Sequence, residues 1–348
     1  MARTERVGIV ANPASGRDIR RLVAGASVSG NADKAGIVLR VLAGLGAAGV
    51  RNALMMPASD GLSAALERQL HSHEHAERDR GAAPLPSLEA LSMPLTGTAA
   101  DSVRAVELMR EAGAAVIVVL GGDGTHRVVA KACGDVPLCA LSTGTNNAFP
   151  EIREGTVAGL AAGLVATGRA GDGALRRELA LAVERGDSEP ELALVDVVLS
   201  ADRFTGARAL WRGAGVSELF VACANPSAVG FSSVAGLLHP LPRAGGRGVH
   251  VRLTDDLSRA QVVLRVPLAP GLLAPVGVAG FRSLELGEEV AAAPGAGCLA
   301  LDGEREIERR PDEHVTVRLM PGPLTIDVDA VMRHAARVGA TRLPGRGG

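Results

Sequence analysis

The short segment GGDGT, directly after an apolar run, places one carboxylate among small residues. Glycines let a phosphate approach the backbone, and the amides at the start of a following helix can donate to it. An acid suits such a place if it binds the Mg²⁺ of a polyphosphate or accepts the proton of an attacking hydroxyl. The alternative is a strand-to-helix turn in which an acid or a hydroxyl caps the helix. The segment comprises Gly121, Gly122, Asp123, Gly124 and Thr125.

Two further polar segments follow apolar runs. The first, NPASGR, offers a hydroxyl, a guanidinium and backbone amides for phosphate through Asn12, Ser15, Gly16 and Arg17. The second, STGTNN, offers hydroxyl and amide partners for ribose, phosphate or adenine through Ser142, Thr143, Gly144, Thr145, Asn146 and Asn147. Each alone is compatible with an ordinary loop. Three such turns in one sheet predict a nucleotide site.

An acidic pair lies in the second half, in the sequence LDGE. Asp302 and Gly303 between two β-like runs are typical of a two-residue hairpin turn. The functional alternative is that Asp302 and Glu304 project into a cleft facing Asp123. Carboxylates from separate domains can then divide metal binding and base catalysis between them. We expect Asp123 or Glu304 as the base, and Asp123 and Asp302 as metal ligands.

Three other groups of residues are weaker candidates. His71, His73 and His75 lie in a charged segment, 71–86, that we interpret as a loop, and no matching ligand pattern for a metal accompanies them. Asp101 is typical of a helix start. A loop that re-enters a helix, forming either a substrate wall or plain core, is expected around Asn225, Gly230, Phe231 and Ser232.

The elements that must position these residues follow two patterns. Up to residue 170, short apolar runs alternate with helical patterns, which indicates an α/β domain with a mostly parallel sheet. Val116–Leu120 is uniformly apolar and is expected to be its central strand. Over 171–326, short β-rich segments separated by Gly and Pro predict an antiparallel sandwich or barrel. A last helix, 327–342, is expected to pack back on the first domain.

Composition excludes several classes of protein. Apolar residues make up 47% and charged residues 22%, the balance of an ordinary soluble, folded chain. The net charge is −1 and aromatics are 2%, so neither a basic surface nor stacking platforms for nucleic acid are expected. Four scattered cysteines without paired CxxC spacing and a strand-like start favour a reducing cytoplasm. No apolar run reaches the roughly 18 residues of a membrane span.

Taken together, the four motifs, which in chain order are NPASGR, GGDGT, STGTNN and LDGE, resemble the superfamily that joins NAD kinases, diacylglycerol-type lipid kinases and sphingosine kinases. Within it, the segments TGTAAD, GGDGTHRVVAKACGDVPL and STGTNNAFPEIREGTVAGLAAGL are most similar to the ATP-NAD-kinase-like proteins associated with acetoin catabolism. The resemblance implies a Rossmann-like N-terminal domain, a C-terminal β-sandwich and an active site between them. It also implies ATP and Mg²⁺ as cofactors and a homo-oligomer, a dimer or a tetramer.

The resemblance assigns the base in two competing ways. The acid of the DGE motif in the lipid kinases corresponds to Glu304, whereas the GGDG acid of the NAD kinases corresponds to Asp123. NAD kinases ordinarily carry an Asn-Glu pair that binds adenosine, and this chain contains no Asn-Glu dipeptide. We therefore expect an ATP-dependent phosphotransferase acting on NAD or a related small molecule. The alternatives are a lipid kinase and a nucleotide-binding regulator without turnover.

Overall fold

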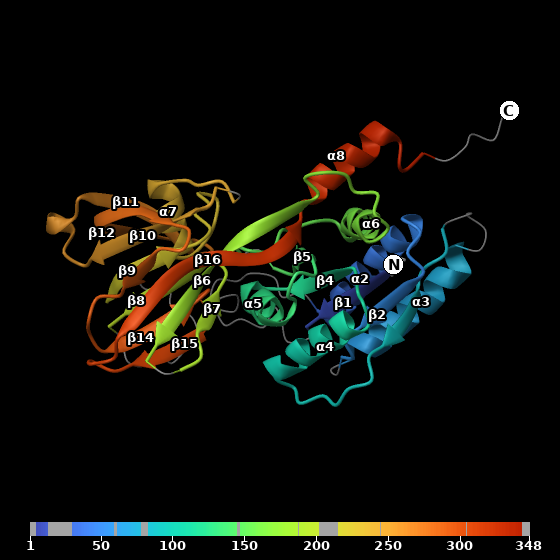
Figure 1. Ribbon diagram of the computed structural model, residues 1–348, viewed down its shortest axis with the longest axis horizontal. Helices are drawn as coiled ribbons and strands as arrows, with labels where there is room; N and C mark the ends of the chain where they lie inside the picture. Colours follow the sequence, from blue (N-terminus) through green and yellow to red (C-terminus); the bar gives the residue numbers. More distant parts are fainter. Residues whose placement is uncertain are drawn as a thin grey trace.

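The computed structural model shows two halves side by side along the longest axis of the molecule (Figure 1). One half combines helices with parallel strands, and the other consists mainly of strands. Two long strands, β6 (Leu175–Arg185) and β16 (Val315–Ile326), run from one half into the other. The structure describes residues 5–12, 30–58, 61–77, 83–144, 147–186, 188–201, 215–243, 245–303 and 305–342.

A parallel sheet forms the centre of the first half, in the order β3-β2-β1-β4-β5. Ala11 lies opposite Leu120, and Gly121 lies opposite Ser142, so three strands end at the same edge. The polar segments that follow these strands must therefore start close together. The strands are β1 (Arg6–Ala11), β2 (Asn52–Met55), β3 (Ser87–Ala90), β4 (Val116–Gly121) and β5 (Leu138–Ser142).

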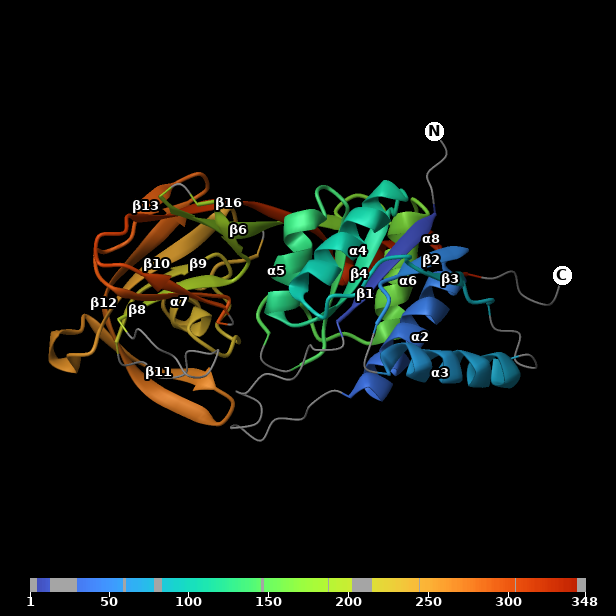
Figure 2. The same ribbon diagram turned by 90° about the horizontal axis from the view of Figure 1, so that it is seen from below.

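Helices cover both faces of this sheet. One face carries α2 (Asn31–Ala47), α3 (Leu62–Glu77), α6 (Gly155–Ala166) and α8 (Val328–Val338), whose apolar side chains share a core with β1 and β4. The other face carries α4 (Ala99–Glu111) and α5 (Asp123–Ala132). Because both faces are covered, β4 is apolar and buried throughout. Of the helices in this half, α5 lies nearest the β-rich half in Figure 2.

The first sheet continues into the second half. Beyond β5 its order is β16-β6-β7, with β13 paired to β16, and these pairings are antiparallel except for β5 with β16. A second, seven-stranded antiparallel sheet has the order β11-β12-β10-β9-β8-β14-β15. Side chains such as Leu181, Val317 and Leu299 fill the core between the two sheets, which makes a sandwich.

The remaining elements belong to this half. Its strands are β7 (Glu191–Ala193), β8 (Asp196–Ser200), β9 (Val216–Val221), β10 (Arg247–Thr254), β11 (Val262–Ala269), β12 (Leu272–Glu285), β13 (Glu289–Ala291), β14 (Gly297–Leu301) and β15 (Arg305–Arg309). A short helix, α7 (Ser232–Leu238), and a 3₁₀ turn, Leu257–Arg259, complete it. Within the described residues, no helix combines the length and the apolar character needed to cross a membrane.

The expected combination of an α/β half with an antiparallel β half is confirmed. Two expectations differ from the structure. The segment 71–86 is not a loop throughout, because α3 extends to Glu77. The hairpin at Asp302 has three residues between paired strands and not two, because Leu301 pairs with Arg305. Asp302 and Gly303 both have positive φ, 54° and 64°, which accounts for the Asp-Gly sequence of this turn.

Candidate functional site

The GGDGT segment forms the junction between β4 and α5. Gly121 ends the strand, Gly122 is the N-cap, and Asp123 is the first residue of the helix. A Cβ at Gly121 would lie only 2.5 Å from the Cβ of Thr125, so this position accepts no larger residue. The glycine therefore lets the first turn of α5 fold back against the end of the strand, where backbone N–H groups of a helix start are concentrated.

Asn12 lies beside this turn. It follows β1, and its Nδ2 donates to Oγ1 of Thr125 at 3.1 Å. Its backbone N–H also donates to the carbonyl of Leu120. The first residue of NPASGR and the last residue of GGDGT are therefore in direct contact.

Asp123 is held by residues far from it in the chain. Its carboxylate accepts the backbone N–H of Phe149 at 2.8 Å and that of Ala148 at 3.1 Å. These two donors come just after the STGTNN segment, so the acid is oriented by the loop that follows β5. A helix cap alone, the alternative role for Asp123, does not account for these two bonds.

The described part of STGTNN is closed by its own hydrogen bonds. Nδ2 of Asn147 donates to Oγ of Ser142 at 2.7 Å, and the N–H of Gly144 donates to the same hydroxyl at 3.2 Å. The backbone N–H of Thr143 donates to the carbonyl of Gly121. Ser142 and Asn147 thus shape the loop and bring it against GGDGT.

Two cations and a histidine at the site were not anticipated from the sequence. Lys34 on α2 is 1% exposed, and its Nζ donates to the carbonyl of Asn12 at 3.0 Å. Lys34 is one of only two lysines among 37 cationic side chains, and this rarity is the sequence signal that marks it.

His126 lies on α5 with Nδ1 2.8 Å from the carbonyl of Gly122. Burial lowers the pKa of His126 to about 4, so its imidazole is neutral at pH 7.

Arg127 is the second cation, one turn of α5 after Asp123. Its Nη1 donates to the carbonyl of Leu301 at 2.5 Å and lies 3.5 Å from Oδ2 of Asp302. The helix that carries the GGDGT acid is thereby attached to the LDGE hairpin. The two acidic motifs, one from each half, are joined through this arginine.

Asp302 is enclosed by backbone donors. Its carboxylate accepts the N–H groups of Leu194, Val195 and Asp196, the shortest at 2.8 Å, and its side chain has no exposed surface. Burial raises the pKa of Asp302, while Arg127 and the backbone donors act in the opposite direction. This geometry fits a residue that holds the hairpin against the β7–β8 turn. Metal binding by Asp302 stays a prediction, and such burial does not favour it.

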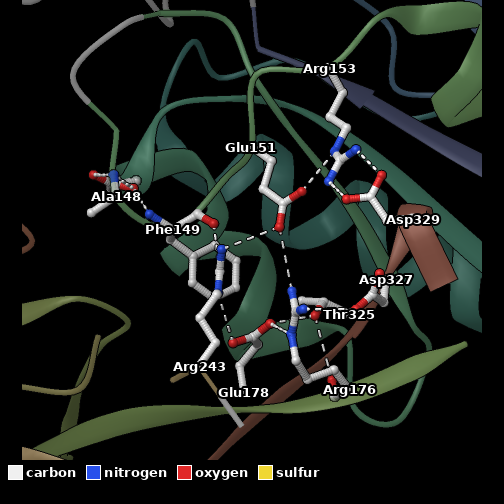
Figure 3. Close-up of polar contacts among 11 residues, drawn as sticks. Ala148, Phe149, Glu151, Arg153, Arg176, Glu178, Arg243, Thr325, Asp327 and Asp329 are labelled. Carbon is white, nitrogen blue, oxygen red and sulfur yellow. Dashed lines mark hydrogen bonds and ion pairs between the residues drawn. The ribbon is translucent and has the colours of Figure 1, made fainter. Parts of the chain in front are cut away.

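An ionic network lies beside Phe149 where the halves meet (Figure 3). Guanidinium groups and carboxylates alternate through it, with Arg243 and Arg176 both against Glu178 on β6. A hydrogen bond from Arg153 holds the pKa of Asp329 below its ordinary value of 3.8. The cavity among these groups measures about 10 Å³, room for about one water molecule. The network comprises Glu151, Arg153, Arg176, Glu178, Arg243, Asp327 and Asp329.

Several candidates lie outside the described residues, namely Ser15, Gly16, Arg17, Thr145, Asn146 and Glu304. His71 and His73 are on α3, two residues apart, so they point to different sides of the helix. Asp101 lies in the first turn of α4 and accepts the N–H groups of Thr96 and Gly97. Phe231 is the N-cap of α7, as expected for a loop that re-enters a helix.

The donor chemistry at GGDGT suits a hard cation. Asp123 and Thr125 provide carboxylate and hydroxyl oxygens, the type of ligand that Mg²⁺ prefers. Among the described residues, no group of three or more His, Cys, Asp or Glu side chains is placed to hold a metal ion. Mg²⁺ commonly binds one or two protein carboxylates and completes its shell with substrate phosphates and water. The residues present therefore fit Mg²⁺ delivered with a nucleotide.

Comparison with known proteins divides the chain as its structure does. Residues 7–170 match the model of the ATP-NAD kinase N-terminal domain, and residues 179–322 match that of the acetoin catabolism protein X C-terminal domain. The first half thus matches an ATP-NAD kinase N-terminal domain, and the second matches a C-terminal domain of acetoin catabolism protein X.

A curated relative specifies that branch. Acetoin catabolism protein X of Cupriavidus necator is 45% identical over 337 residues, which cover 95% of this chain and 92% of the relative. The chain belongs to the acetoin catabolism protein X family. A solved structure named as a diacylglycerol kinase from Bacillus anthracis overlaps with a TM-score of 0.46 and 11% identity, covering 95% of this chain and 100% of that one. That degree of overlap supports no further conclusion.

Proposed function

We propose that the protein is an ATP-dependent phosphotransferase of NAD-kinase type, which phosphorylates a hydroxyl of NAD or of a related small molecule. The observation that carries this proposal is the hydrogen bond from Asn12 to Thr125. It joins two polar segments at the edge where β1, β4 and β5 end, the place where open α/β sheets bind ligands. The match of residues 7–170 to an ATP-NAD kinase domain supports the same assignment.

In this proposal the chain's own residues bind and orient. The glycines of GGDGT admit the polyphosphate to the start of α5, and Asn12 and Thr125 fix the loop. Asp123, with its carboxylate oriented by Phe149, holds Mg²⁺ or takes the proton of the acceptor hydroxyl. Mg²⁺ bound with ATP offsets the charge of the phosphates. Glu304 stays the competing base, supplied by the hairpin that Arg127 holds.

Turnover with one defined substrate set tests the proposal. Purified protein, ATP, Mg²⁺ and NAD should give NADP, and Asp123→Asn should lower the rate at least 100-fold, as expected for loss of a general base. Asparagine retains an oxygen for the N–H of Phe149, so the loop should stay folded. Asp135→Asn is the matched control, because that side chain is 88% exposed beyond α5. Equal rates in all three proteins would remove Asp123 from the mechanism.

A panel of acceptors separates the remaining alternatives. Diacylglycerol, sphingosine and small alcohols replace NAD in the same ATP-consumption assay, and polyphosphate replaces ATP as the donor. Turnover of a lipid, and of no other acceptor, would identify the protein as a lipid kinase. Tight binding of ATP or NAD without product would make it a nucleotide-binding regulator.

The cellular setting is part of the proposal. The relative from Cupriavidus necator is named for acetoin catabolism, and we extend that setting, together with NADP biosynthesis, to this chain. A homo-oligomer, a dimer or a tetramer, and a cytoplasmic location stay predictions. Light scattering of the purified protein tests the first, and fractionation of cells tests the second.

A further inference from the structure

Phe149 is bonded through its backbone to both halves of the molecule. Its N–H donates to Oδ1 of Asp123 at 2.8 Å, and its carbonyl accepts from Nη2 of Arg243 at 2.7 Å. Asp123 begins α5 in the first half, whereas Arg243 lies between α7 and β10 in the second. One residue therefore connects the GGDGT carboxylate with an arginine of the β-rich half, as Figure 3 shows for the arginine side.

Arg243 is itself held in one position. Its Nε donates to Oε2 of Glu178 at 3.2 Å, and its guanidinium lies 5.3 Å from the centre of the Phe149 ring. Glu178 is almost fully buried on β6 and also accepts from Arg176 and Thr325. Arg243 is thus fixed to one of the two strands that link the halves, and a cation over an aromatic ring adds to the attraction.

The backbone of Phe149 couples the position of its carbonyl to the position of its N–H. Only the φ and ψ angles of Phe149 separate its N–H from its carbonyl, because peptide groups are planar. Pro150 follows, and a residue before proline is confined to a small range of backbone angles. Phe149 is 1% exposed, so other parts of the protein pack around it. A shift of the carbonyl by Arg243 must therefore shift the N–H that orients Asp123.

We propose that Arg243 is a positioning residue that sets the orientation of the Asp123 carboxylate through Phe149, and so couples the placement of the β-rich half to the reactive acid. This inference rests on the proposed phosphotransferase function. The side chain of Arg243 is 22% exposed, and its segment contains none of the four motifs found in the sequence. A misplacement of about 1 Å at a reacting group can lower a rate by roughly 100-fold.

The kinetic test is a double-mutant cycle. Arg243→Met should lower kcat by 10-fold or more and leave the KM for ATP within twofold. Arg243→Lys keeps a charge near Glu178 but lacks the guanidinium fork, and should recover part of kcat. In an Asp123→Asn background, Arg243→Met should lower kcat no further, because both changes act on the same carboxylate. Additive losses in kcat would overturn the inference.

Hydrogen exchange tests the inference without turnover. The amides of Ala148 and Phe149 should exchange at least 10-fold faster in Arg243→Met than in the wild-type protein, beyond any change in global stability that urea unfolding of the same variant measures. Arg247→Met is the matched control. Arg247 lies close to Arg243 in the chain, and its ion pair with Glu285 is exposed. Unchanged protection in Arg243→Met would overturn the positioning role. A wild-type protein that phosphorylates no acceptor would refute the proposed function instead, and the exchange result would still decide the role of Arg243.

Discussion

Arg127 and Asp302 are 175 residues apart in the chain and form a buried ion pair, with Nη1 of the arginine 3.5 Å from Oδ2 of the aspartate. Their side chains are 8% and 0% exposed. Arg127 follows Asp123 by one turn of α5, and Asp302 opens the LDGE hairpin. The pair therefore brings the acidic motif of the second half to the helix that carries the acidic motif of the first.

Removing the cation of this pair should destabilise the fold. In Arg127→Met, the Asp302 carboxylate keeps its backbone donors but loses its counter-charge in a buried place. Losing one partner of a buried ion pair costs about 3 to 5 kcal/mol. Arg127 also opposes the burial that raises the pKa of Asp302, so the variant should protonate Asp302 more readily. The deficit in unfolding free energy should therefore be larger at pH 7 than at pH 4.

Urea unfolding at both pH values measures this effect. Arg104→Met is the control, because Arg104 pairs with Glu107 on the surface of α4, where both side chains are about half exposed. Such a pair contributes roughly 0 to 1 kcal/mol. Equal midpoints for the two variants would show that the Arg127 pair adds nothing beyond a surface pair.

The sequence predicted which polar segments follow the ends of strands, because that pattern depends on neighbouring residues. Apolar strands followed by glycine and polar residues place Asn12, Asp123 and Ser142 at strand ends, and parallel pairing then brings those ends together. The contact between Asn12 and Thr125 follows from this local pattern. The last helix, expected over 327–342, starts as expected with Asp327 as the N-cap of α8, but it ends earlier, because Gly339 is its C-cap.

Contacts between distant segments could not be predicted in this way. Arg243 meets Phe149 across 94 residues, and nothing in its own loop indicates that partner. Strand β6 carries Arg176, Arg177 and Glu178 directly after its first residue, Leu175, and so its start lacks the apolar alternation of a half-buried strand. Its charged residues enter the ionic network between the halves, where ion pairs offset the cost of burial. Tertiary pairing with β16, which no local pattern encodes, decides that this segment is a strand.

His126 should make the protein sensitive to mild acid. Burial lowers its pKa from 6.5 to about 4, so the unfolded chain binds a proton at a higher pH than the folded chain does. Stability is then present above pH 6.5 and falls as the pH drops toward 4, by up to about 3 kcal/mol at 1.4 kcal/mol per pH unit. In His126→Gln, this part of the dependence of the unfolding free energy on pH should be lost. Thermal unfolding of the variant and the wild-type protein between pH 4 and 7 measures it. A slope unchanged by His126→Gln would contradict the assignment.

Gly44 on α2 should tolerate no side chain. A Cβ there would lie 2.5 Å from the backbone nitrogen of Leu160 on α6, and a backbone cannot move aside as a side chain can. Gly44→Ala should therefore cost roughly 1 to 3 kcal/mol, the range found for overpacking. Gly36 is the control on the same helix, where an added Cβ meets only flexible side-chain ends at 3.4 Å or more. Gly36→Ala should be neutral or gain up to about 1 kcal/mol. Similar melting temperatures for both variants would mean that α2 and α6 can separate.

The two lysines of the chain provide the last comparison. Lys34 is 1% exposed and donates to the carbonyl of Asn12, whereas Lys131 pairs with Glu191 at 2.7 Å and is about one-third exposed. Methionine keeps the apolar stem of either lysine and removes its charge. Lys34→Met leaves the Asn12 carbonyl without this donor and should cost about 1 to 3 kcal/mol. Lys131→Met should cost less than about 1 kcal/mol.

Because Asn12 also holds Thr125, Lys34→Met should weaken ATP binding, measured by calorimetry, while Lys131→Met leaves it unchanged. Equal ATP affinity in both variants would show that Lys34 stabilises the fold but does not support the proposed nucleotide site.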